Sequence, residues 1–169
     1  MTLVVPDNPF WTFSIQLYAK PGVAPACLAL QERHGLDVNI VLYCAWLGAQ
    51  RGVRVNIDDV TRIIESVRPW SEDVVVRLRV IRTAMKGDAR GAPQAFSDGL
   101  RNDIKRSELD AERIEQHILF TQSWSDAPGA TRSAFVAREN VQAYLKYLGI
   151  RPDSNDEFHV GSILGGLDS

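Results

Sequence analysis

A nearly continuous apolar stretch at residues 38–50 constrains the fold more than any other feature of this sequence. Asp37 precedes it and suits a helix N-cap, because its carboxylate accepts hydrogen bonds from the first free backbone amides. Drawn as a helix, the stretch has apolar side chains around nearly its whole circumference: Val38, Ile40, Val41, Leu42, Tyr43, Cys44, Ala45, Leu47 and Ala49. A helix that is apolar all round is buried, and this one is shorter than the roughly 20 residues of a membrane span. We therefore predict that it is the central helix of a bundle.

Cap residues and helical spacing predict further helices around this central one. Asn8 before Pro9 indicates a helix that begins at Pro9, and Gly35 is suited to end the next one. Pro69 is expected to end a helix and Ser71 to begin another. The predicted helices span residues 9–19, 23–34, 38–50, 57–67, 71–86, 98–122 and 133–148, with a turn at 124–130. Strand patterns are weak, so the sequence predicts an all-α, single-domain bundle of about six to seven helices.

The end of the chain carries no clear helical or strand period. We therefore predict a helical domain over residues 1–150 and an irregular C-terminal tail over residues 151–169. The apolar residues of this tail offer an edge that docks on the body: Phe158, Val160, Ile163 and Leu164. The turn formers in residues 87–97 predict an exposed loop that is open to proteolysis.

Charge and cysteine content exclude several classes of protein. The net charge of the 169-residue chain is −2, which favours neither nucleic acid nor an acidic surface as a partner. Cys27 and Cys44 lie in apolar segments without a metal-binding spacing, so we expect buried, reduced thiols and a cytoplasmic location. The first residues have no basic segment followed by a long apolar one, and no signal peptide is expected.

The motifs of common enzyme and cofactor sites are absent from the sequence. A di-iron bundle needs Glu-x-x-His on its helices, but Gln31 stands three residues before His34 and Ile114 three before His117. The chain has no glycine-rich phosphate loop, no G-x-S-x-G elbow and no H-E-x-x-H motif. We therefore expect no catalytic residues, no metal and no cofactor.

A polar corner at residues 31–39 is the first candidate site. Asn39 interrupts an apolar helix, and a buried amide without partners costs about 1–3 kcal/mol, so we expect it to bind something specific. In one interpretation Asp37 and Asn39 cap the helix and hold the corner together. In the other, Arg33, His34, Asp37 and Asn39 belong to a pocket for a ligand or partner.

An acidic row on the long helix 98–122 is the second candidate site. Residues at helical spacing predict the buried stripe of this helix: Leu100, Ile104, Ser107, Ala111, Ile114 and Ile118. Glu108, Glu112 and Glu115 follow at the edge of that stripe, where they can orient Arg77 or Arg82 of the preceding helix. Structural ion pairing is one interpretation, and a paired-carboxylate site for acid–base chemistry is the other.

Several segments together resemble an uncharacterised family of small helical bacterial proteins, a domain of unknown function. The resemblance covers about residues 8–120 and fades after Trp124. It implies a cytoplasmic helical protein without an established activity, metal or cofactor. The residues that carry it are Asn8-Pro9-Phe10-Trp11, Leu17-Tyr18, Pro21-Gly22-Val23, Cys27-Leu28-Ala29-Leu30-Gln31, Gly35-Leu36-Asp37-Val38-Asn39, Trp46, Trp70, Arg79, Arg82, Lys86 and Glu108-Leu109 with Ala111-Glu112-Arg113-Ile114-Glu115.

These observations lead to one main functional hypothesis and two alternatives. The main one is a non-enzymatic helical module that binds a protein partner or itself. The first alternative is a small-molecule-binding protein or small enzyme whose pocket joins the 31–39 corner, Arg82, Glu108 and Glu112. The second is binding of an anion or nucleic acid by the more basic residues 51–90. A membrane is not an expected partner.

Overall fold

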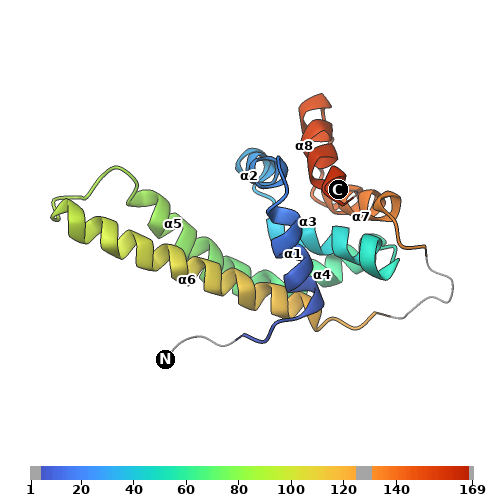
Figure 1. The fold of residues 1–169 in the computed structure, drawn as a ribbon, viewed down its shortest axis with the longest axis horizontal. Coiled ribbons are helices and arrows are strands. Elements are labelled where there is room, and N and C mark those ends of the chain that lie inside the picture. Colours follow the sequence, from blue (N-terminus) through green and yellow to red (C-terminus); the bar gives the residue numbers. More distant parts are fainter. Residues whose placement is uncertain (1–4, 125–130, 168–169) are drawn as a thin grey trace.

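Helices form every regular element that the computed structural model describes, over residues 5–124 and 131–167. Most of the elements make a body, and a long helical hairpin projects from it (Figure 1). In chain order the elements are α1 (Pro9–Tyr18), α2 (Val23–His34), α3 (Val38–Trp46), the π-helical turn η1 (Leu47–Arg51), α4 (Ile57–Trp70), the π-helical turn η2 (Ser71–Val75), α5 (Val76–Ala84), α6 (Gln94–Phe120), α7 (Ala134–Tyr147) and α8 (Ser154–Gly165). The predicted all-α fold is confirmed. Most of the turn expected at 124–130 lies outside the described residues.

The predicted cap residues begin and end the helices of the body. The Asn8 side chain accepts a hydrogen bond from the backbone amide of Trp11 at 2.9 Å, and Asp37 accepts one from Asn39. Gly35 ends α2 with a φ of 65°, a left-handed conformation that costs glycine little. Local chemistry therefore sets these boundaries, and the sequence predicted them correctly.

The helix formed by α3 and η1 is the centre of the body, as its apolar circumference predicted. All residues from Asn39 to Gly48 are buried. Tyr43 packs against the rings of Phe10 and Trp46 with centroids 5.0 and 5.7 Å apart. Because this helix is buried on all sides, its polar residue Asn39 needs hydrogen-bond partners from other elements.

Gly48 allows η1 and α7 to approach each other closely. A Cβ atom on Gly48 would lie 2.3 Å from the backbone nitrogen of Ala137, far inside van der Waals contact. The backbone amide of Ser133 also donates to the Gly48 carbonyl oxygen at 3.3 Å. Only glycine therefore fits at the contact between the central helix and α7.

We predict that Gly48→Ala destabilises the protein because backbone atoms cannot move aside as a side chain can. The expected loss is about 1–3 kcal/mol of unfolding free energy, measured by urea denaturation. Gly161→Ala in α8 is the control, since its Cβ would meet open space. Equal stability of the two variants would contradict the close approach.

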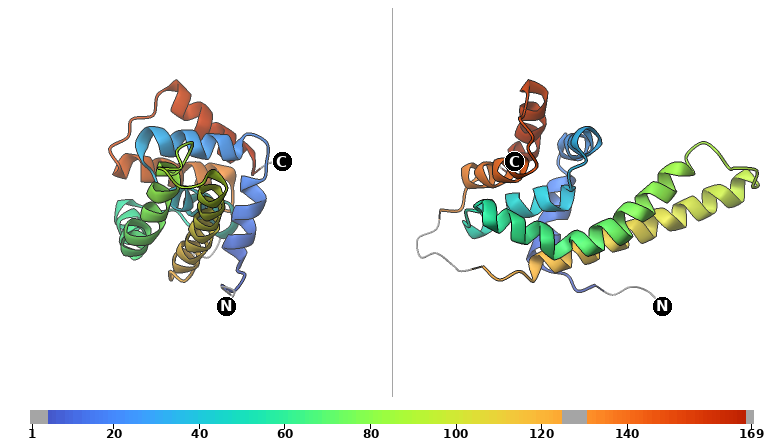
Figure 2. Two further views of the ribbon diagram at one scale, coloured as in Figure 1. Left: turned by 90° about the vertical axis from the view of Figure 1, so that its left-hand side faces the viewer. Right: turned by 180° about the vertical axis from the view of Figure 1, so that it is seen from behind.

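The helix break predicted at Pro69 is wrong. Pro69 lies inside α4, and the chain continues through η2 into α5 without a side-chain cap at Ser71. Proline removes one backbone donor and crowds the preceding turn, and the wider π-helical turn that follows lets the helix continue past it. The helix changes direction in this region (Figure 2). Trp70 anchors the bend by donating its indole hydrogen bond to the Ala111 carbonyl oxygen at 2.9 Å.

The C-terminal tail is also not irregular as predicted. Residues 154–165 form α8, which begins with a capping box made by Asp153 and Asp156 and packs on α2. Val160, Ile163 and Leu164 are buried as the expected docking edge, whereas Phe158 is 67% exposed. Glycine weakens helix propensity at two positions of this segment, Gly161 and Gly165, so packing on α2 decides its conformation. Within the described residues, no helix has both the length and the apolar character needed to cross a membrane.

Candidate functional site

The structure divides the predicted candidate residues among three places. Arg33 and His34 contact the start of α8. Arg33 binds Asp153 with Nη1 and Nη2 at 3.0 and 2.6 Å, and it also reaches Asp156 at 3.0 Å. His34 Nε2 lies 2.9 Å from the same Asp156 oxygen. The hydrogen bond from Arg33 is the main cause that lowers the pKa of Asp153. Arg33 and His34 therefore hold the start of α8 against α2 and are separate from the other candidates.

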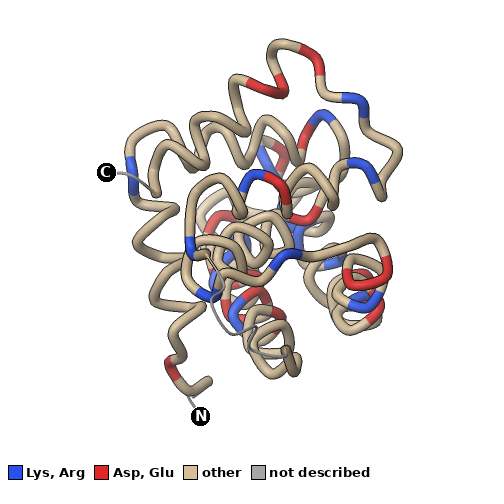
Figure 3. The backbone as a smooth tube through the Cα atoms, turned by 90° about the vertical axis from the view of Figure 1, so that its right-hand side faces the viewer, with Lys and Arg blue, Asp and Glu red and all other residues tan. Residues whose placement is uncertain are grey.

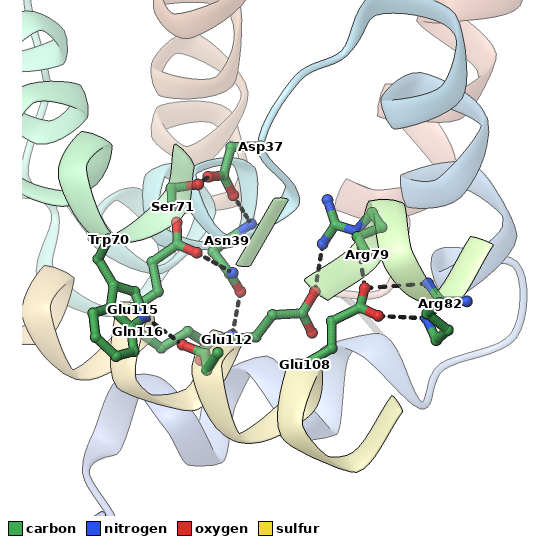
Figure 4. A network of polar contacts seen from close by, with 11 residues as sticks. Asp37, Asn39, Trp70, Ser71, Arg79, Arg82, Glu108, Glu112, Glu115 and Gln116 are labelled. Atoms are coloured by element: carbon green, nitrogen blue, oxygen red, sulfur yellow. Dashed lines mark hydrogen bonds and ion pairs between the residues drawn. The ribbon is translucent and has the colours of Figure 1, made fainter. Parts of the chain in front are cut away.

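Asp37 and Asn39 lie instead in a buried hydrogen-bonded network between α3 and α6 (Figure 4). Asn39 Nδ2 donates to Glu115 Oε2 at 3.2 Å, and Asn39 Oδ1 accepts from Gln116 Nε2 at 2.8 Å. Asp37 accepts from the Ser71 hydroxyl at 3.0 Å. The corner is thus tied to η2 and α6; Asp37 caps α3, whereas the side chain of Asn39 binds α6 and caps no helix.

Glu115 is the most strongly perturbed acid of this network. Its side chain is fully buried, and no cation binds it among the described contacts. The pKa of Glu115 is raised to about 10, mainly by burial and then by the charge of the neighbouring Asp37 carboxylate and a hydrogen bond shared with it. Glu115 is therefore protonated at neutral pH and acts as a neutral partner for Asn39.

A second cluster joins α5 to α6 by ion pairs. Arg79 donates to Glu108 at 3.0 Å and to Glu112 at 2.6 Å, and Arg82 binds Glu108 through both Nε and Nη2. Burial acts to raise the pKa of Glu108, but the two arginines outweigh burial and lower it. Burial raises the pKa of Glu112, against the lowering effect of Arg79. The cluster therefore links α5 to α6 through charge-assisted hydrogen bonds between partly buried side chains.

The acidic row thus lies on the buried face of α6 and not at its edge. Glu108 is 5% exposed and Glu115 is 0% exposed, whereas Leu100, predicted to be core, is 55% exposed. The edge was the expected place because charged groups are rarely buried without partners. Here the arginines and Asn39 provide those partners, so the helix is rotated relative to the prediction.

Sequence reasoning also missed several members of the two clusters. Arg77, one of the two predicted partners of the acidic row, binds only the exposed Asp73 at 2.7 Å among the described contacts, and Arg79 takes its place. The i, i+3 spacing of Arg79 and Arg82 opposite the i, i+4 spacing of Glu108 and Glu112 is the signal that identifies this pairing. Ser71 and Gln116 bind Asp37 and Asn39 only because η2 and α6 pack against α3. No local sequence pattern predicts these two contacts.

The candidate residues do not line the cavity next to α1. A cavity of about 350 Å³ lies between α1, η1 and the start of α7, next to Phe13 and Lys20. Within the described chain no group of three His, Cys, Asp or Glu residues is placed to hold a metal ion. Acidic and basic residues are interspersed around the backbone of the body (Figure 3).

Comparison with known proteins gives a family for this chain. The model of the family described as "Protein of unknown function (DUF2390)" matches residues 9–119. The chain belongs to this family. The resemblance found in the sequence is therefore confirmed, and the DUF2390 match ends within α6, before α7 and α8. No curated protein and no solved structure matches the sequence.

We predict that Arg79→Ala destabilises the protein, because it leaves two glutamates close together and short of positive charge. A loss of about 2–3 kcal/mol is expected, less than for a fully buried pair since these side chains keep some solvent contact. Arg77→Ala is the matched control and should cost less than about 0.5 kcal/mol, because its pair with Asp73 is exposed. Chemical denaturation of both variants measures the difference, and equal losses would refute a supporting role for the cluster.

We predict that Glu115→Gln removes a pH dependence of stability. The folded chain keeps the Glu115 proton up to about pH 10, and the unfolded chain releases it near the ordinary glutamate pKa of 4.5. Between these values the folded state binds more protons, so the unfolding free energy falls as pH rises, by up to about 1.4 kcal/mol per unit. Glutamine mimics the protonated acid and cannot ionise.

Urea denaturation between pH 6 and 9 tests this prediction. The variant should lose the slope and exceed the parent in stability at pH 9. Glu65→Gln, an exposed position of α4, should keep the parent slope. An unchanged slope in Glu115→Gln would show that Glu115 is not the titrating group.

Proposed function

We propose that this DUF2390 protein is a cytoplasmic, non-enzymatic interaction module of a bacterium, and that its hairpin docks a protein partner. The hairpin consists of α5, residues 85–93 and the part of α6 that projects beyond the body (Figure 2). The buried thiols of Cys27 and Cys44, with pKa values raised by burial to about 12, suit a reducing compartment. The observation that carries the proposal is that charged side chains lie between the two helices of the hairpin, whereas apolar side chains lie on an outer side.

Charged side chains hold the two helices of the hairpin together. Arg79 and Arg82 bind Glu108 and Glu112 across the helix pair, and Arg101 donates to the backbone carbonyl of Arg82 at 3.2 Å. None of the residues of α5 is buried, although the helix contains valine, leucine and isoleucine. Charged groups therefore make much of the contact between the two helices, and no residue of α5 belongs to the buried apolar core.

Apolar side chains instead lie along one outer side of this hairpin, here called the hairpin face. On each helix they recur at the i, i+3 and i, i+4 spacing of a single stripe. A groove of about 190 Å³ near the tip is lined by Met85 together with Phe96 and Leu100, so the stripes of the two helices adjoin. The hairpin face consists of Leu78 and Ile81 of α5, Met85 directly after α5, and Phe96, Leu100 and Ile104 of α6; Leu78, Met85 and Ile104 are half-buried and the other three are exposed.

Three apolar side chains of this face are largely exposed. Ile81 is 49% exposed, Leu100 55% and Phe96 75%. Complete burial of one such side chain contributes about 1.5–3 kcal/mol, so several on one surface favour a docked partner. Ile81 follows Arg79 by two residues, about 200° around the helix, and so points away from the ion pairs.

The alternative of a small-molecule pocket draws less support from the same residues. These charged candidates already bind other residues of the protein. Arg33 and His34 bind the start of α8, Arg82 binds Glu108, and Asp37 accepts a hydrogen bond from Ser71. These contacts use the donors and acceptors that a ligand would need. The interaction module is therefore the function that we propose.

A photo-crosslinking experiment in the native host tests the docking face. We expect a photoreactive phenylalanine analogue at position 100 to capture a protein, because Leu100 lies on the hairpin face. The same analogue at position 80 is the control, since Val80 is 61% exposed but lies outside that face. Capture at neither position, or equally at both, would contradict the proposal.

A further inference from the structure

We propose that the cavity next to α1 binds a small organic carboxylate whose apolar part packs inside it. This inference goes beyond the proposed docking role, because no residue of the hairpin lines the cavity. The volume of about 350 Å³ lies at the lower end of the range of about 300–1,000 Å³ that is usual for ligand pockets. The cavity therefore suits a small molecule.

Four segments of the body meet at this cavity: α1, η1, the start of α7 and the residues that follow α8. The close contact at Gly48 holds η1 against α7, where the Ser133 amide donates to the Gly48 carbonyl oxygen at 3.3 Å. Gly166 lies so close to α1 that a Cβ atom on it would be 2.8 Å from Leu17 Cδ1. Tertiary packing thus forms the walls before any ligand binds, which lowers the cost of binding.

One part of the lining is apolar. Phe13 and Leu17 of α1 lie there together with Ala49 and Leu167. Phe13, Ala49 and Leu167 are only partly buried by the rest of the protein. A hydrocarbon group in the cavity would remove more of this surface from water, which favours a ligand with an apolar part.

The other part of the lining is polar and carries one positive charge. The Lys20 side chain is half-buried, and no carboxylate of a described residue pairs with it. Gln16 and Gln50 are exposed at the rim, and neither side chain binds another described residue. No described lining residue is acidic. A half-buried cation without a counter-ion favours an anion as ligand.

The start of α7 adds hydrogen-bond donors to the lining. Ser133 and Ala134 both line the cavity. The Ser133 side-chain oxygen accepts a hydrogen bond from the Val136 amide at 3.2 Å, which leaves its hydroxyl hydrogen available to a ligand. The first turn of α7 contains no acidic residue, so the positive end of the helix dipole acts in the same sense as Lys20.

The composition of the lining favours a carboxylate over a phosphate group. A phosphate group carries nearly two negative charges and is often bound by bidentate arginines. The described lining contains one lysine and no arginine. A single lysine beside an apolar wall matches an acid with one negative charge and a short hydrocarbon chain.

Titration of the isotope-labelled full chain with sodium hexanoate, followed by NMR, tests the site. We expect saturable shifts of the amides of lining residues such as Leu17, Gln50 and Ala134, with a dissociation constant of about 1 mM for a probe of this size. Acetate lacks the chain and hexanol lacks the charge, so each should bind at least about 10-fold more weakly. Absence of a saturable shift with hexanoate, or equal binding of hexanol, would overturn the inference.

Removal of the Lys20 charge tests the proposed contact with the carboxylate. Lys20→Met keeps a hydrocarbon side chain and should weaken hexanoate binding at least about 10-fold without changing the binding of hexanol. Lys105→Met is the matched control, since Lys105 is exposed on α6 and does not line the cavity. Unchanged hexanoate affinity in Lys20→Met would contradict the site.

Filling the cavity tests the place of the apolar part. Ala134→Leu should abolish the hexanoate shifts, whereas Ala95→Leu at an exposed position of α6 should bind like the parent. Circular dichroism establishes that each variant is folded. Hexanoate binding by folded Ala134→Leu would show that the probe binds elsewhere, and Lys20→Met decides the inference if Ala134→Leu does not fold.

Discussion

Carboxylates along one face of α6 are the constraint on which the arrangement of this protein depends. Glu115 is buried beside Asn39 of the central helix, and Glu108 and Glu112 lie further along the same face in contact with Arg79 and Arg82. One end of this polar seam attaches α6 to the body, and the other end attaches α5 to α6. The long helix therefore belongs to the body and to the hairpin at the same time.

The polar seam also explains why apolar residues of the hairpin face outward. Buried glutamates are tolerated only where arginines pair with their charges. The charged sides of α5 and α6 therefore face each other. A helix that turns charges inward must turn its apolar stripe elsewhere, and here the stripe faces solvent on both α5 and α6. Fold and proposed interaction surface thus follow from the same interaction.

The α2–α8 contact illustrates a different use of charge. Asp153 and Asp156 cap their own helix and also bind Arg33 and His34, so a local helix signal and a tertiary contact share the same carboxylates. Sequence reasoning assigned Arg33 and His34 to the same candidate pocket as Asn39. They separate because α2 turns its C-terminal end toward α8, whereas the helix after Asp37 runs into the core.

The sequence by itself determined the all-α class, the family, the central helix and the helix boundaries set by Asn8, Gly35 and Asp37, because these depend on local capping and on continuous apolar character. Tertiary structure decided the rest. Continuation of the helix past Pro69 and the helical state of residues 154–165 depend on packing against distant elements. The rotation of α6 depends on whether its glutamates find arginines, and no local pattern records a partner that lies tens of residues away in the chain.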